Sequence, residues 1–140
     1  MVSILLRCLI LVVVLWLSGC AGLQQAILPP PPSENSAVVA LLDKAHSQTS
    51  AGQLDQAGAS LERALRIEPR NPSLWQELAR VRLEQGQYQQ AENLAAKSNA
   101  LAGDNHTLRS ENWRIIGQAR SQRGDAQGAR TAFDKAESGG

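Results

Sequence analysis

The sequence contains few aromatic side chains, few cysteines and no excess of charge of one sign. Its 140 residues include three Trp, one Tyr and one Phe, and 14 Lys and Arg stand against 13 Asp and Glu. This balance argues against a nucleic-acid-binding protein, which would show a basic patch or stripe. The scarcity of aromatics, together with abundant Ala, Leu, Gln and Arg, favours helices over sheets.

Sequence patterns for catalysis and for metal or cofactor binding are also missing. The sequence has no H-E-x-x-H, no G-x-S-x-G, no P-loop and no paired cysteines, and its two histidines, His46 and His106, are isolated. Acidic residues are spread at spacings that suit surface pairs, such as Glu62 with Arg66 four residues later. We therefore expect a protein that is not an enzyme and that holds no metal or cofactor.

Residues 1–19 have the layout of a secretory signal peptide. Arg7 lies at the start of a short apolar stretch that ends at Leu17, and small residues follow. The stretch falls short of the ~20 apolar residues that a membrane-spanning helix needs, so an uncleaved signal anchor is the weaker interpretation. Removal of the signal would also remove Cys8 and leave a single cysteine, which excludes an internal disulfide.

Leu17 ends the apolar stretch, and Ser18, Gly19 and Cys20 follow it directly. These four residues resemble the lipobox of bacterial lipoproteins, in which the cysteine takes the lipid and the signal is cut before it. The resemblance implies that Cys20 is lipidated and that Ala21, which is not Asp, permits sorting to the outer membrane. Several acyl chains on one residue anchor a protein stably, so we expect the mature protein to face the periplasm from a lipid anchor in the outer membrane.

Residues 20–36 are expected to form the lipidated cysteine and a flexible, disordered Pro-rich tether. Residues 29–32 are four consecutive prolines, which cannot lie in a helix interior and favour extended polyproline II. The 16 residues after the cysteine span at most about 50–55 Å. A spacer is favoured over a ligand for a proline-reading domain, because a spacer needs no partner.

The rest of the chain repeats itself. Segment 51–57 (AGQLDQA) aligns with segments 85–91 (QGQYQQA) and 123–129 (RGDAQGA), and the aligned glycines lie 34 and then 38 residues apart. The surrounding apolar residues fall at helical spacing, as in the series Leu54, Ala57, Leu61 and Ala64. These observations predict helix pairs that are joined at glycine-containing turns.

The period and the glycine turn resemble those of the tetratricopeptide repeat (TPR), and Trp75 and Trp113 begin matches to its W-x-x-L-G pattern. The resemblance implies an all-α fold of three antiparallel helix pairs, in which both tryptophans lie in the core. The last helix has a small apolar face of alanines and Phe133, which either needs no cover or docks a partner. The expected boundaries are 37–140 for the domain and about 38–71, 72–105 and 110–140 for the repeats, with residues 106–109 inserted before the third.

In the TPR family, the first helix of each pair lines a concave groove, and its exposed residues contact partner peptides. Carried over to this sequence, the partner-binding groove comprises His46, Gln76, Arg80, Leu83, Glu84, Glu111, Arg114 and Gln118. Arg80 and Arg114 are the best candidates for partner contacts, because Arg is enriched at interface hot spots. The alternative is that both arginines are merely solvated.

The combination of signal, lipobox, proline-containing tether and one small TPR domain resembles the pseudomonad-type lipoprotein activators of class A penicillin-binding proteins. These lipoproteins bind the bifunctional synthase in the periplasm and stimulate peptidoglycan synthesis. The resemblance implies a class A penicillin-binding protein as partner, a membrane contact through the lipid, and no nucleic acid. Two alternatives remain: a pilotin-like lipoprotein that carries secretin subunits of the type IV pilus, and a scaffold for envelope complexes without effect on catalysis.

Overall fold

The structure, a computed structural model, describes residues 33–139. This part of the chain forms helices and turns and contains no strand, which confirms the expected all-α fold. The signal peptide, Cys20 and the proline run lie outside the described residues. No described helix has the length and apolar character that crossing a membrane would require. The helices are α2 (Ser36–Ser50), α3 (Leu54–Ile67), α4 (Pro72–Glu84), α5 (Tyr88–Leu101), α6 (His106–Gln122) and α7 (Ala126–Glu137).

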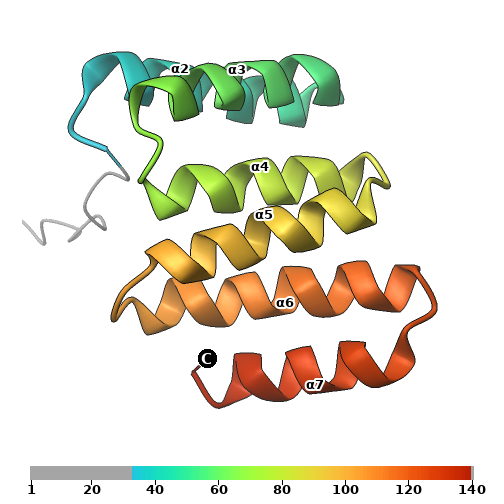
Figure 1. Cartoon of the computed structure of the whole chain (residues 1–140). Helices are drawn as coiled ribbons and strands as arrows, with labels where there is room; N and C mark the ends of the chain where they lie inside the picture. The colour runs from blue at the N-terminus through green and yellow to red at the C-terminus, as the bar shows by residue number, and fades with distance from the viewer. Residues whose placement is uncertain (1–32, 140) are drawn as a thin grey trace, which may run out of the picture.

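The helices form three antiparallel pairs that stack in sequence order, from α2 and α3 at one end to α6 and α7 at the other (Figure 1). Helix α3 contacts α4 and helix α5 contacts α6, so each pair packs on the next. The first helices of the second and third pairs, α4 and α6, also touch directly. This arrangement matches the three repeats that the 34-residue period predicted.

The repeated glycine has the same structural role in all three pairs. Gly52, Gly86 and Gly124 have φ of 73°, 74° and 83°, in the left-handed region that glycine enters without a steric penalty. At the first turn, the N–H of Gly52 donates to the carbonyl of Thr49 at 2.9 Å, and the next N–H donates to the carbonyl of Gln48 at 2.8 Å. These two bonds define a Schellman motif, which satisfies carbonyls at the end of the first helix and reverses the chain.

An asparagine caps the first helix of every pair. The side-chain oxygens of Asn35, Asn71 and Asn105 each accept a backbone N–H from the first turn at 3.0 Å. Such a cap satisfies one of the N–H groups that a helix start leaves unpaired. After Asn71, Pro72 occupies the first helical position, where its missing N–H costs no bond within the helix.

The ends of two repeats differ from the expected boundaries. Ser33, expected in the tether, is only 7% exposed, and its hydroxyl donates to Glu68 Oε1 at 2.6 Å. The folded unit therefore includes residue 33. The inserted residues 106–109 form the first turn of α6 and make it the longest described helix, at 17 residues.

The core consists of two clusters of different composition. The cluster between the first two pairs is rich in leucine and valine, including Val38, Leu61 and Leu74, which are at most 1% exposed. The cluster between the last two pairs consists mainly of alanine, with Ile115 and Ile116 as its large members. Alanine lets helices approach closely but buries little apolar area, so this second interface needs other stabilising contacts.

The two repeat tryptophans are only partly buried. Trp75 packs against the first cluster and donates its indole N–H to the carbonyl of Pro69 at 2.9 Å, and Trp113 packs against the second cluster. Lys135 Nζ lies 4.3 Å from the centre of the Trp113 ring system. The expected core location is thus correct for one side of each ring, and the other side meets solvent or a cation.

Helix α7 is the last helix of the described residues 33–139. Its buried residues are Ala129, Ala132 and Ala136, while polar residues such as Arg130 and Asp134 are exposed. Phe133 keeps 37% of its surface exposed and lies against Gly117 of α6, where a Cβ would come within 2.6 Å of its ring. A terminal repeat with a polar outer face is what a solenoid requires at its end.

Candidate functional site: a groove between the second and third repeats

A groove of ≈ 450 Å³ lies along helices α4 and α6, the first helices of the second and third pairs. Its lining residues are Arg80, Leu83, Glu84, Glu111, Arg114, Ile115 and Gln118. The structure therefore brings together six of the eight residues that the TPR resemblance assigned to a partner-binding groove. Ile115, only 5% exposed, is the one lining residue that the TPR resemblance did not assign to the groove.

The two remaining predicted residues lie elsewhere. Gln76 is 5% exposed, and its amide Nε2 donates to Asn112 Oδ1 at 3.1 Å and to the carbonyl of Leu108 at 3.3 Å. Gln76 is therefore a buried structural residue, which corrects its assignment to an exposed groove surface. His46 is exposed on α2, where its Nε2 lies 3.3 Å from Glu77 Oε2 of α4, outside this groove.

The charges of the groove separate into one neutralised pair and two free groups. Arg80 of α4 donates to Glu111 of α6 at 2.8 Å, so this ion pair joins the two helices. Arg114 and Glu84 are both exposed, and neither has an ion-pair partner among residues 33–139. An arginine whose donors are not used within the protein can give them to a partner's carboxylate or carbonyl groups.

A buried polar network fixes the two helices that form the groove. Asn112 of α6 is fully buried, and its Nδ2 donates to Ser98 Oγ at 2.7 Å and to Asn99 Oδ1 at 3.0 Å, both on α5. The hydroxyl of Ser98 in turn donates to the carbonyl of Pro72 at the start of α4, at 2.8 Å. Together with Gln76, these bonds connect α4, α5 and α6. Buried polar networks specify one arrangement of their helices when their members are satisfied, and here the side-chain groups of Asn112, Ser98 and Gln76 all have partners.

This network was not predicted from the sequence, although Ser98 lies where the TPR pattern has a small buried alanine. A polar residue at a position that the repeat buries is the signal that could have revealed it, because a buried hydroxyl requires a partner. Asn112, directly before the repeat tryptophan Trp113, gives the same signal on the facing helix. Neither residue lines the groove, so both act on it only through the positions of its helices.

Ion pairs complete the contacts between successive repeats. Glu92 of α5 accepts from Arg120 of α6 at 2.7 Å and from Arg123, which directly follows α6, at 2.8 Å. Glu62 of α3 pairs with Arg82 of α4 at 2.5 Å, and not with Arg66 as its helical spacing suggested. These carboxylates therefore hold neighbouring repeats together. Over residues 33–139, no three His, Cys, Asp or Glu residues lie close enough together to hold a metal ion.

Comparison with known proteins agrees with the geometry. The family model described as tetratricopeptide repeat matches residues 48–111. The globular C-terminal domain of P. aeruginosa LpoP is similar over 75% of this chain and 99% of that domain, with 42% identity and a TM-score of 0.73. A search of the curated proteins gives no match.

Two more distant structures share the fold. The N-terminal domain of stress-induced protein-1 (STI-1) from C. elegans is 16% identical over 75% of this chain and 87% of its own, with a TM-score of 0.68. The Sgt2 TPR domain from Aspergillus fumigatus is 22% identical over 80% of this chain and 72% of its own, with a TM-score of 0.69. At the higher identity of the LpoP domain, and with nearly all of that domain covered, the chain belongs to the LpoP-like family of TPR domains.

Proposed function

We propose that this protein is a periplasm-facing, outer-membrane lipoprotein whose TPR domain activates a class A penicillin-binding protein. The observation that supports this proposal most is the 42% identity to the C-terminal domain of LpoP over 99% of that domain. The layout of the whole chain supports it as well, because a signal, a lipobox at Cys20 and a short tether before one small TPR domain resemble the pseudomonad-type activators. In this proposal the chain itself is not catalytic, and peptidoglycan synthesis is performed by the partner.

The groove between α4 and α6 is the surface that we assign to the partner. Half-buried Leu83 offers apolar surface beside the free cation Arg114 and the free anion Glu84, and the nearly buried Ile115 completes the lining. A matching segment of the synthase would place an apolar side chain between an acidic group and a basic group. Charges arranged in this way fix the orientation of a bound segment and disfavour wrong partners. The Arg80–Glu111 pair contributes less, because it is already satisfied within the domain.

Activation by binding requires that the TPR domain prefer one conformation of the synthase. A ligand shifts a conformational equilibrium only by its differential affinity for the two states. The domain would bind the active conformation more tightly than the resting one and thereby raise the active fraction. A substrate that favours the active conformation should strengthen the binding of the TPR domain. By linkage, the TPR domain should strengthen the binding of that substrate by the same factor.

A binding experiment tests the partner and the face together. The partner is first recovered with the full chain from detergent-solubilised envelopes, and its affinity is then measured for wild type, Arg114→Glu and Arg130→Glu. Arg130, on the outer face of α7, is the matched control, because it is an exposed arginine away from the groove. We expect Arg114→Glu to weaken binding at least thirtyfold, since hot-spot arginines contribute about 2 kcal/mol or more. Arg130→Glu should leave the affinity unchanged.

Three results would contradict parts of this proposal. Recovery of secretin in place of a penicillin-binding protein would favour the pilotin alternative. Equal affinity of wild type and Arg114→Glu would show that the groove is the wrong face. Binding without any increase in synthesis would favour a scaffold.

A further inference from the structure

The two ends of the stack differ in their surface chemistry. The outer face of α7 mixes charges of both signs, including Arg130 and Asp134, and buries its small apolar residues. The outer face of the first pair is different: a shallow hollow of ≈ 500 Å³ combines apolar residues with arginines and is lined by no acidic residue. Its lining residues, which we call the first-repeat end face, are Ala37, Ala40 and Leu41 of α2 with Arg63, Arg66 and Ile67 of α3.

The apolar part of the first-repeat end face is unusual for the end of a repeat stack. Ile67 is 44% exposed and is the most exposed large apolar residue of residues 33–139. Leu41 is half-buried beside it. Terminal repeats normally present a polar outer face to stay soluble, as α7 does here.

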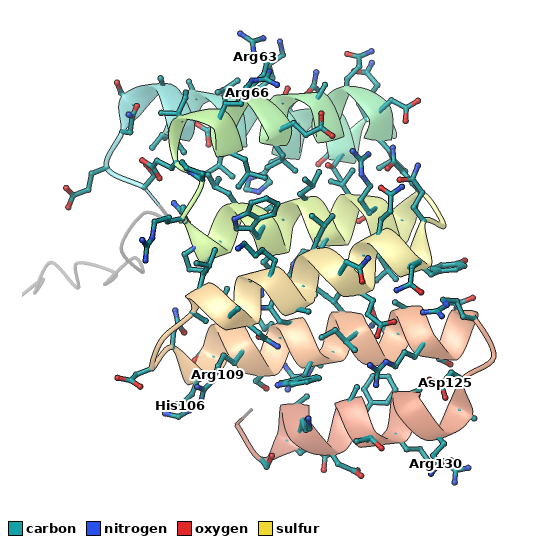
Figure 2. The ribbon with its side chains drawn as sticks, viewed as in Figure 1. Arg63, Arg66, His106, Arg109, Asp125 and Arg130 are labelled. Atoms are coloured by element: carbon teal, nitrogen blue, oxygen red, sulfur yellow. The ribbon has the colours of Figure 1, made fainter. Side chains whose placement is uncertain are left out.

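The charge of this face is positive and is not neutralised from within the domain. Arg63 and Arg66 point outward from the stack, away from the other helices (Figure 2), and neither takes part in an ion pair among residues 33–139. Lys44 adds a third exposed cation, because it follows Leu41 by three residues and so lies on the same side of α2. Three acidic residues lie close to this face in sequence: Glu62 is engaged with Arg82 of the second pair, Glu68 accepts from Ser33 and Asn71, and Asp43 is exposed beside Lys44. None of them forms an ion pair with Arg63 or Arg66 among residues 33–139.

We propose that the first-repeat end face is a docking surface for an anionic phospholipid membrane. Basic side chains beside exposed aliphatic residues combine attraction to acidic headgroups with shallow burial of apolar surface in the interface. The lining of the first-repeat end face has no aromatic side chain, which makes it a poor fit for a proline-rich segment. It also has no acidic group, which makes it a poor fit for a basic peptide. An anionic bilayer matches both its charge and its exposed Ile67.

The position of the face relative to the chain ends makes weak binding sufficient. The described part of the chain begins at Ser33, which precedes α2 and donates to Glu68 at the end of α3, so the segment that leads to Cys20 joins the first repeat. That segment has 13 residues and spans at most about 45 Å. Short flexible linkers give effective concentrations in the millimolar range, so a contact too weak to bind a free protein would still be occupied. This last step rests on the lipid anchor of the proposed function, whereas the affinity of the face for lipid does not.

The proposal can be tested with the mature chain from residue 21, which keeps the tether and all described helices and lacks the lipid. Flotation is measured with vesicles of phosphatidylglycerol and phosphatidylcholine, and with vesicles of phosphatidylcholine alone. The protein should float with the anionic vesicles only. Flotation should fall steeply between about 0.1 M and about 1 M salt, as the screening length drops from about 10 to about 3 Å.

Variants then locate the contact. Loss of two cations in Arg63→Gln/Arg66→Gln should weaken partitioning about thirtyfold, at about 1 kcal/mol per basic side chain. Ile67→Ser should weaken binding to anionic vesicles without changing its dependence on salt. The control Arg130→Gln removes an exposed cation from the opposite end of the stack, away from the bound lipid, and should change partitioning less than about twofold, because the attraction to the lipid surface is screened over distance. Unchanged thermal unfolding would show that each variant is folded.

Two results would overturn the proposal. The first is absence of flotation with anionic vesicles at low salt, and the second is an equal loss per charge in the Arg130→Gln control. If Arg63→Gln/Arg66→Gln instead reduces the affinity for a penicillin-binding protein in solution, the face belongs to a protein partner. The groove variant Arg114→Glu should not affect flotation, so failure of the proposed function and failure of this inference give different results.

Discussion

Replacing Asn112 by alanine should weaken the packing of the third repeat against the second. The change removes the three hydrogen bonds of Asn112 to Gln76, Ser98 and Asn99. Ser98 keeps its bond to a backbone carbonyl, and Gln76 keeps only its longer one of 3.3 Å. Asn99 Oδ1 loses its partner, and Asn99 Nδ2 is already buried without one. One stranded buried group costs about 1–3 kcal/mol, and each lost bond about 1 kcal/mol.

We therefore expect Asn112→Ala to lower the free energy of unfolding by about 3 kcal/mol, which includes part of the cost of the cavity. For a domain of this size, the melting temperature should fall by roughly 15 °C. The matched control is Asn93→Ala, which removes an exposed asparagine of α5 and should cost less than about 0.5 kcal/mol. Both are measured by thermal and urea unfolding followed by circular dichroism. A loss below about 1 kcal/mol for Asn112→Ala, or equal losses for both variants, would refute the importance of the network.

Three further predictions concern single features of the fold. Asp125→Ala removes the cap that accepts the N–H of Gly128 at 2.8 Å, so α7 should lose about 1 kcal/mol and its amide hydrogens should exchange faster. Gly124→Ala forces a side chain into φ 83° and should lower the stability by about 1–2 kcal/mol, measured by urea unfolding. Glu92→Gln removes the ion pairs of Glu92 with Arg120 and Arg123, so its effect on unfolding, about 1 kcal/mol, should shrink in high salt.

The helix pairs could be predicted from the sequence because each repeat carries its own turn signal. A glycine such as Gly52 or Gly86 is needed where the chain enters the left-handed region, and it recurs at a fixed period. The groove residues followed from the TPR resemblance, in which the first helix of each pair lines the concave side. Six of the eight assigned residues consequently line one groove, Arg80 and Arg114 among them.

The parts that the sequence did not reveal depend on contacts between repeats. The four inserted residues extend α6 by a turn that includes Leu108, whose carbonyl accepts from Gln76. This extra turn explains why Gln76 is buried, although its position in the repeat predicted exposure. The partner of Glu62 is likewise on the next repeat and not on its own helix. Helical spacing describes one helix at a time and cannot choose between such partners.

If the groove between α4 and α6 binds and activates a peptidoglycan synthase, a glycan-polymerisation assay should detect the activation. A class A penicillin-binding protein is assayed with saturating mature chain carrying wild-type, Arg114→Glu or Arg130→Glu sequence. We expect a faster rate with wild type and with Arg130→Glu, and at equal concentration a loss of stimulation with Arg114→Glu. No increase in rate at saturating wild-type protein, or full stimulation by Arg114→Glu, would contradict this proposal.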